Sequence, residues 1–289
     1  ACLSSFGICY NSDSLRRLGV TELPASWEDL TNPVFFRQVA LADPTKSGSV
    51  ARAFELLVQG EMLKVLEADP QNRDAALALG WTKGLQLIQR MAANARYFTD
   101  SASKIPQDVG QGNAAAGMCI DFYGRSFAHD LSSADGKPRV VWIAPEGGTT
   151  LSADPVAVLK GAPNSDIAQR FVEFCLSREA QQLWFALPGT EHGPKLRALH
   201  RTPIRRDVYT PEILAQSTMP GIHPYEDPGN FTNRAPYPTL HLLREDRIAQ
   251  VVQAFPAAAA IYEANMDTMR RLGRQGWQDL MDGSKDLAR

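Results

Sequence analysis

The sequence predicts an α/β fold with a mainly parallel sheet, and three observations support this prediction. Strand-like and helix-like segments alternate through roughly the first two thirds of the chain, as in a parallel sheet with crossover helices. Two serine-containing polar turns, at 47–49 and 101–103, lie where helices are expected to begin. The composition, 44% hydrophobic and 21% charged over 289 residues, is that of a globular protein with enough apolar surface for two modest cores.

Short apolar runs predict the buried strands, and apolar residues at helical spacing predict the helices between them. The strand-like runs are residues 6–10, 38–42, 115–121, 140–144 and 155–159. The helical stripes are Val50, Phe54, Leu57 and Val58, then Trp81, Leu85, Ile88 and Ala92, and finally Ile167, Phe171, Phe174 and Cys175 after a start at Asn164 or Ser165. Residues 217–239 are rich in proline and predicted to be irregular, and 240–272 are predicted to be helical with a break or kink at Pro256.

Charge and residue usage exclude several classes of protein. The formal charge of −2 gives no strong field for nucleic acid or an anionic membrane, so neither is expected as a partner. No apolar run approaches the ~20 residues that a membrane helix needs. The histidines are scattered and the cysteines form no CxxC pair, so no metal site and no cofactor are expected, and no disulfide pairing is selected. The chain opens directly in a strand-like run, which we interpret as a cut, the alternative being a mature terminus after signal-peptide cleavage.

Two serine-containing turns are candidate ligand-binding elements. Ser47, Gly48 and Ser49 lie between a predicted strand and a predicted helix, where backbone N–H groups lack partners and carry partial positive charge. Glycine lets a ligand approach the backbone, so this turn suits an anion or a strongly polar oxygen. Ser101 and Ser103 repeat the arrangement before the next predicted helix. The alternative is that these serines only cap their helices.

A third candidate group follows the predicted strand that ends at Asp121. Arg125 could grip a carboxylate or phosphate through two parallel hydrogen bonds, and Tyr123 could donate its hydroxyl or stack on a ligand. The alternative is that Asp121 and Arg125 form an ion pair on the start of a helix.

The fourth candidate is the connection around residues 145–150, which contains two glycines in succession. Glu146 and Thr149 are predicted to contact a ligand from this connection, which suits a hinge. A plain turn is the alternative.

The order of these motifs resembles the family 1 extracellular solute-binding proteins, which have the type 2 periplasmic binding protein fold, and the similarity covers about residues 6–210. The ferric-iron-binding branch of ABC transporter substrate-binding components is the most similar. The matching segments are 8–11, 23–30, 43–49 and a helix with Phe171, Phe174, Leu176, Ser177, Glu179, Gln181 and Trp184. Two departures stand out: Phe122-Tyr123 replaces the adjacent tyrosines of ferric-binding members, and residues of the family's first lobe are missing.

The resemblance implies an architecture of two lobes, each with three αβα layers, of which the first is incomplete. We expect a nearly complete α/β lobe at 12–143, and a partial second lobe made of 1–11 and 144–289 with hinge strands and a C-terminal helical extension. The lobes would close around a ligand by hinge motion. The implied protein is periplasmic, monomeric and non-enzymatic, and it would deliver its solute to the permease of an ABC importer in the inner membrane.

The predicted solute is small and either anionic or rich in oxygen, because the helix-start turns and Arg125 suit an anion. Ferric iron with a synergistic anion is the second candidate. A different class of function is a hydrolase or transferase that uses the same cleft with Asp121 as base, although no GxSxG motif is present. A sensor or adaptor domain with this fold is a further alternative.

Overall fold

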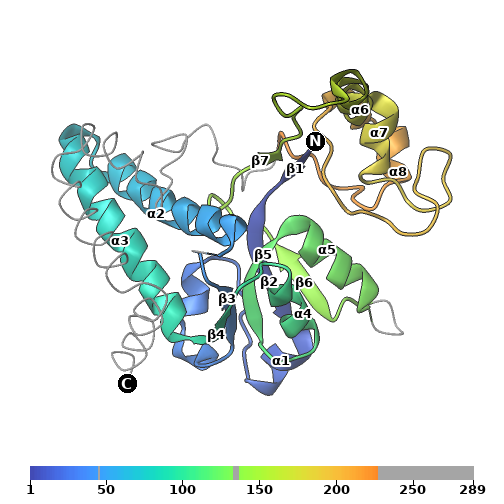
Figure 1. The fold of residues 1–289 in the computed structure, drawn as a ribbon. Coiled ribbons are helices and arrows are strands. Elements are labelled where there is room, and N and C mark those ends of the chain that lie inside the picture. Colours follow the sequence, from blue (N-terminus) through green and yellow to red (C-terminus); the bar gives the residue numbers. More distant parts are fainter. Residues whose placement is uncertain (45, 133–136, 227–289) are drawn as a thin grey trace.

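The structure is a computed structural model, and it describes residues 1–44, 46–132 and 137–226 (Figure 1). Its main sheet has five strands in the order β4-β3-β5-β2-β6. They are β2 (Phe6–Asn11), β3 (Val39–Ala42), β4 (Ala95–Thr99), β5 (Ala116–Ile120) and β6 (Val140–Ile143). The α/β class predicted from the alternation of strands and helices is therefore confirmed.

The direction of the strands follows the predicted parallel pattern with one exception. Strand β3 pairs in parallel with β4 and β5, whereas β2 pairs antiparallel with both β5 and β6. Strands β5 and β6 therefore point the same way, and β2 lies between them. Helix α5 (Asp121–Asp130) makes the connection between these two parallel strands. Residues 6–11, which the predicted division placed with the second lobe, form strand β2 of the main sheet, between β5 and β6. The division into two lobes stays a prediction.

Helices of the first 143 residues pack around this sheet (Figure 1). They are α1 (Ser12–Arg17), α2 (Gly48–Ala68), α3 (Arg73–Ala93), α4 (Lys104–Gly110) and α5, with 3-10 helices η1 (Glu28–Thr31), η2 (Pro33–Phe35) and η3 (Pro70–Asn72). Helices α2 and α3 form an antiparallel hairpin in which two glycines allow close contact. A Cβ at Gly80 would lie 2.3 Å from the Cα of Met62, and a Cβ at Gly84 would lie 2.5 Å from the Cα of Val58.

The predicted stripes of α2 and α3 form part of the core. Val50, Phe54, Leu57 and Val58 are buried, as are Trp81, Ile88 and Ala92, and Leu85 packs against them. The core continues into the sheet through fully buried side chains such as Ile8 and Leu41. The four cysteines, all within the described ranges, are free thiols.

A small second sheet connects the main sheet to the rest of the chain. Strand β1 (Cys2–Ser4) pairs antiparallel with β7 (Ser152–Asp154). The prediction of a strand at 155–159 is wrong: β7 ends at Asp154, and Leu159 is 80% exposed. Pro155 has no N–H for a strand ladder, and an apolar run becomes a buried strand only where a partner strand is available.

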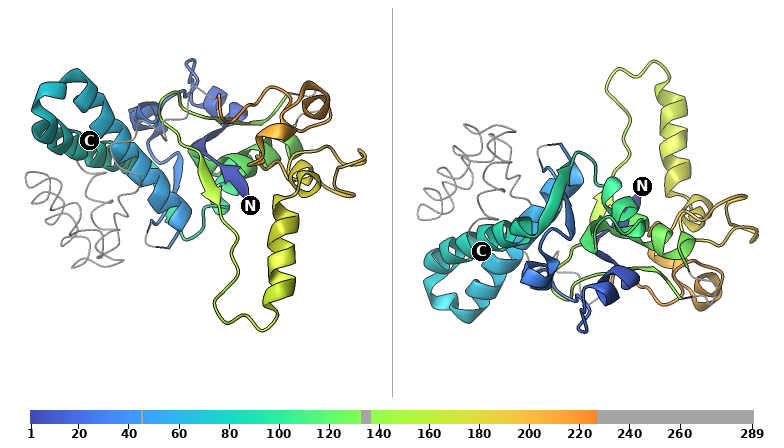
Figure 2. Two further views of the ribbon diagram at one scale, coloured as in Figure 1. Left: turned by 90° about the horizontal axis from the view of Figure 1, so that it is seen from above. Right: turned by 90° about the horizontal axis from the view of Figure 1, so that it is seen from below.

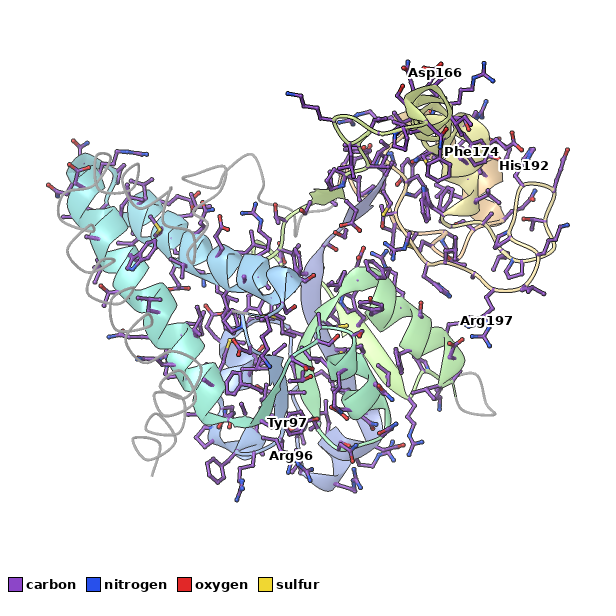
Figure 3. The ribbon with its side chains drawn as sticks, viewed as in Figure 1. Arg96, Tyr97, Asp166, Phe174, His192 and Arg197 are labelled. Carbon is purple, nitrogen blue, oxygen red and sulfur yellow. The ribbon has the colours of Figure 1, made fainter. Side chains whose placement is uncertain are left out.

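The second part of the structure follows β7 and contains α6 (Ser165–Leu176), α7 (Arg178–Leu183), the 3-10 helix η4 (Arg206–Val208) and α8 (Pro211–Ala215). Its small core consists of Phe185, Val208 and Met219. Helix α6 begins at Ser165, as predicted, but none of its residues is buried, and Phe171 is 60% exposed. Figure 2 shows α6 projecting away from its neighbours, and Figure 3 places Phe174 on this helix.

The C-terminal predictions lie largely outside the described residues. The proline-rich stretch is described only up to residue 226, where Ser217 and Met219 are buried. The predicted helix at 240–272 is not among the described residues. None of the helices within the described ranges has the length and apolar character needed to cross a membrane.

Candidate functional site

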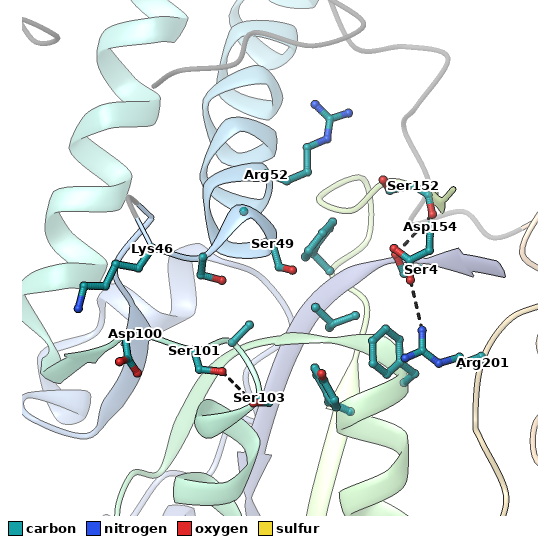
Figure 4. Close-up of a pocket in the computed structure, with 17 residues that line it drawn as sticks. Ser4, Lys46, Ser49, Arg52, Asp100, Ser101, Ser103, Ser152, Asp154 and Arg201 are labelled. Carbon is teal, nitrogen blue, oxygen red and sulfur yellow. Dashed lines mark hydrogen bonds and ion pairs between the residues drawn. The ribbon is translucent and has the colours of Figure 1, made fainter. Parts of the chain in front are cut away.

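A cavity of about 530 Å³ opens at the edge of the main sheet where β3, β4 and β5 end (Figure 4). These three strands are parallel, so the turns that follow them meet at one edge, the usual position of ligands in open α/β sheets. The opposite wall comes from β1, β7 and the segment around Arg201. The lining residues are Ser4, Phe6, Lys46, Ser47, Gly48, Ser49, Arg52, Asp100, Ser101, Ala102, Ser103, Ile120, Phe122, Tyr123, Ser152, Asp154 and Arg201.

The turn at Ser47, Gly48 and Ser49 caps α2 and also lines the cavity. The Ser47 hydroxyl accepts a hydrogen bond from the Val50 N–H at 3.4 Å, so the capping role is present. A Cβ on Gly48 would meet no atom within 4 Å, so the backbone here is open to a ligand. The 21 residues of α2 direct the positive end of the helix dipole at this point. The turn can therefore cap its helix and receive an oxygen-rich ligand at the same time.

The second serine turn is held by hydrogen bonds that join the ends of two neighbouring strands. The hydroxyl oxygens of Ser101 and Ser103 lie 2.8 Å apart. The Ser101 N–H donates to the Thr99 hydroxyl at 3.3 Å, and the Thr99 carbonyl accepts from the Asp43 N–H at 2.8 Å. Ser103 makes no side-chain cap for α4. The two hydroxyls are thus held as a pair at the cavity, and they face Arg201 and Asp154 across it (Figure 4).

Only Tyr123 of the third predicted group lines the cavity. Asp121 is 1% exposed and forms an ion pair with Arg125 at 3.1 Å. The Thr202 hydroxyl donates to the Asp121 carboxylate at 3.4 Å, and Arg125 donates to the Thr202 hydroxyl at 3.0 Å. Burial raises the pKa of Asp121, although the Arg125 charge opposes this change.

The prediction that Asp121 and Arg125 bind the ligand is not supported by this geometry, and the alternative of an ion pair is what the structure contains. Helix α5 begins directly at Asp121, so residues four apart share one face of it. That face packs against the segment that carries Thr202, and neither Asp121 nor Arg125 is among the residues that line the cavity. Arg125 also lies over the ring of Trp142, 5.0 Å from its centroid.

Thr149 and Glu146 also lie outside this cavity. The Thr149 hydroxyl accepts from the Phe6 N–H at 3.2 Å and donates to the Phe6 carbonyl at 2.6 Å, and it is 1% exposed. Thr149 therefore fixes the start of β2. Glu146 lines a separate cavity of about 270 Å³, next to the place where the Trp27 indole donates to the Gly148 carbonyl at 2.7 Å.

Sequence reasoning missed several polar residues of the cavity. Lys46, Arg52 and Asp100 are sequence neighbours of the predicted serine turns, so proximity in the sequence could have included them. Other residues come from distant segments, and no local pattern identifies them: Ser4, Ser152, Asp154 and Arg201. Within the part of the chain that the structure describes, no group of three or more His, Cys, Asp or Glu side chains could hold a metal ion.

Comparison with known proteins identifies the family. The family model for bacterial extracellular solute-binding proteins matches residues 3–188. The chain belongs to this family. The predicted resemblance is therefore confirmed. Residues 221–279 match a separate model, that of a protein of unknown function (DUF1415).

The relatives of this chain include an uncharacterized protein, a putrescine/cadaverine-binding protein and a transport regulatory protein. The chain is 29% identical over 199 residues to an uncharacterized protein of Haemophilus influenzae, a match covering 68% of the chain and 48% of the relative. It is 26% identical over 187 residues to a putrescine/cadaverine-binding protein of Pseudomonas aeruginosa, covering 60% of the chain and 46% of the relative. It is 22% identical over 181 residues to the phosphoglycerate transport regulatory protein PgtC of Salmonella typhimurium, covering 63% and 39%. The chain thus spans less than half the length of these relatives.

Solved structures similar to this protein include a periplasmic binding protein and an iron-bound protein. The periplasmic binding protein AfuA of Actinobacillus pleuropneumoniae, with fructose-6-phosphate bound, has 25% identity and a TM-score of 0.48, and the match covers 63% of this chain and 49% of that one. Iron-bound HitA of Pseudomonas aeruginosa has 17% identity and a TM-score of 0.44, covering 79% and 60%.

Proposed function

We propose that this chain is the solute-capturing part of an ABC importer's binding protein and that it binds a small anionic or oxygen-rich solute in the 530 Å³ cavity. Membership of the solute-binding family supports the class of function. The observation that carries the site is the convergence of turns from the ends of β3, β4 and β5 on one cavity, with hydroxyls and a helix start directed into it.

The charges around the cavity favour an anion. Three cationic side chains line it, those of Lys46, Arg52 and Arg201, against two acidic ones, those of Asp100 and Asp154. Arg52 also pairs with Glu55 at 2.6 Å, so part of its charge is compensated. The N-terminus of α2 adds the equivalent of roughly half a positive charge. Backbone N–H groups at a helix start and serine hydroxyls donate hydrogen bonds to the oxygens of anions such as carboxylate and phosphate.

The geometry is less suited to the ferric-ion alternative. Phe122 replaces one of the two adjacent tyrosines expected in ferric-binding members, so one phenolate ligand is missing. The Arg201 guanidinium lies 3.8 Å from the centroid of the Phe122 ring. A permanently charged cation at this position repels Fe³⁺ and attracts an oxyanion.

The enzymatic alternative depended on Asp121 as a base in the cleft. Asp121 is buried outside the cavity, where its carboxylate is paired with Arg125 and accepts from Thr202. A general base must reach the proton that it removes, and Asp121 is not among the residues that line this cavity. We therefore propose binding without turnover, in a protein that acts as a monomer in the periplasm and delivers its solute to a membrane permease.

A thermal-shift panel tests this function. The full chain is heated with inorganic phosphate, 3-phosphoglycerate, glucose 6-phosphate, putrescine or ferric citrate, the last three chosen to separate sugar phosphate, cation and iron binding. A solute at 100 times its dissociation constant stabilises the folded state by about 2.7 kcal/mol, or about 5–10 °C for a protein of this size.

The expected result is stabilisation by at least one oxyanion, with the compound recovered unchanged. Ser49→Ala is expected to reduce the shift, whereas Ser165→Ala, on the exposed start of α6, is expected to leave it unchanged. Absence of a shift with every compound would remove the proposal's support, and a shift only with putrescine would replace the anion by a cation.

A further inference from the structure

Arg201 is held in a fixed orientation at the wall of the cavity opposite to α2. Its backbone N–H donates to the Trp184 carbonyl at 2.9 Å, which fixes the position of its main chain. Its guanidinium lies over the Phe122 ring at 3.8 Å and is 5.8 Å from the centroid of Trp184. The side chain is only 29% exposed. The planar group is therefore oriented before any solute arrives.

The ion pair and the hydrogen bond of the Arg201 guanidinium both involve a single nitrogen, Nη1. Nη1 lies 3.3 Å from the Asp154 carboxylate and donates weakly to the Cys2 sulfur at 3.6 Å. Among the described residues, Nε and Nη2 have no hydrogen-bond partner. A guanidinium has five N–H donors in a planar fork, and the pair on Nε and Nη2 matches two oxygens of a carboxylate or phosphate.

Asp154 is a weak counter-ion for this group. It lies at the end of β7, directly opposite Cys2 in β1, and its side chain is 49% exposed. A half-exposed pair with a single 3.3 Å contact contributes little stability, so an oxyanion can compete for the same guanidinium. Figure 4 shows Arg201 and Asp154 together on one side of the cavity, with Ser49, Ser101 and Ser103 on the other.

We propose that Arg201 is a second oxyanion-recognition residue and Asp154 its internal competitor, so that the preferred solutes carry two acidic groups. One group would bind at the start of α2 and the other at Arg201. This inference rests on the proposed function, because it names the class of solute for the same cavity. The arrangement of two separate cationic positions, one from a helix start and one from a stacked arginine, selects diacids over monoacids.

Two probes of equal length test the inference, 3-phosphonopropionate and propylphosphonate. Both carry a phosphonate on a chain of three carbons. The chain ends in a carboxylate in 3-phosphonopropionate and in a methyl group in propylphosphonate. Titration calorimetry with the full chain is expected to show at least tenfold tighter binding of the diacid. In Arg201→Gln, the ratio of the affinity for 3-phosphonopropionate to that for propylphosphonate is expected to fall below threefold. The affinity for propylphosphonate is expected to stay within threefold of that of the unmodified chain.

Two more variants separate recognition from folding. Arg201→Lys keeps the charge but loses the planar fork, so it should recover only part of the advantage. Asp154→Asn removes the competitor and should raise diacid affinity severalfold. The thermal midpoint of each unliganded variant shows whether it folds.

The inference is overturned if both probes bind equally to the unmodified chain, or if Arg201→Gln weakens the binding of both equally. It is also overturned if neither probe binds at 10 mM, a concentration about tenfold or more above ordinary solute dissociation constants. The proposed function would survive each of these results if another compound of the panel stabilised the protein.

Discussion

Replacement of Gly48 by alanine is expected to make the protein more stable and its site weaker at the same time. A Cβ at this position would meet no atom within 4 Å, and Gly48 does not have a positive φ. Alanine loses less backbone entropy than glycine when it folds into a helix, so the free energy of unfolding should rise by about 0.4–1 kcal/mol. For a protein of this size, that corresponds to an increase of about 1–4 °C in Tm.

The same methyl group would stand where a solute oxygen approaches the start of α2. Loss of one hydrogen bond to a charged solute costs about 1.5–3 kcal/mol, which weakens binding about tenfold or more. The assay is titration calorimetry with the strongest compound of the panel, beside thermal unfolding of the unliganded chain.

Gly60→Ala is the matched control for this variant. Gly60 lies in the middle of the same helix, a Cβ there also meets no atom within 4 Å, and the residue does not line the 530 Å³ cavity. It should give the gain in stability without any loss of affinity. If Gly48→Ala binds as tightly as the original chain, the solute does not approach this backbone and the site has been placed wrongly.

Three further changes test the structural roles of Thr149, Arg125 and Asp108. Thr149→Val should lower the free energy of unfolding by about 1–3 kcal/mol in urea titrations, because two buried backbone groups of Phe6 lose their partner, and solute affinity should not change. Arg125→Met should cost about 3–5 kcal/mol by leaving Asp121 buried and unpaired, and a loss of affinity without loss of stability would return Arg125 to the binding site. Asp108, buried in α4, accepts hydrogen bonds from Tyr97, Lys104 and Asn113. Burial by itself raises the pKa of Asp108, but these hydrogen bonds outweigh this effect and hold the pKa below its ordinary value. The resulting stability is present above the unfolded pKa of about 3.9 and is lost as the pH falls through the folded pKa, so Asp108→Asn should be less stable than the original at pH 7 and approach it in acid. A difference that does not depend on pH would contradict this assignment.

Local sequence patterns predicted correctly those helices and strands whose apolar residues pack against a neighbouring element of the fold. The stripes of α2 and α3 and the strands 38–42 and 115–121 correspond to structure because each apolar run has a partner nearby in the fold. The run at 155–159 has the same composition but no partner strand, and it is not a strand. The antiparallel direction of β2 also could not be inferred, because an apolar run has the same pattern in either direction.

The residues that line the cavity were predicted on one wall only. Ser47, Ser49, Ser101 and Ser103 follow parallel strands, and the geometry of a parallel sheet brings such turns together. The residues of the opposite wall, among them Arg201, depend on how segments almost 200 residues apart meet, and no local pattern contains this information. Asp121 and Arg125 are residue types that are common in binding sites, but the helix that starts at Asp121 directs both side chains toward the segment that carries Thr202.

A crystal structure of the full chain with the strongest compound of the panel is the most direct measurement of where this protein holds its solute. Oxygens of the compound within about 3.2 Å of the backbone N–H groups at Gly48 and Ser49 would agree with the site described here. Electron density for the compound anywhere else, with the space between Ser49, Ser101 and Arg201 filled only by water, would contradict it.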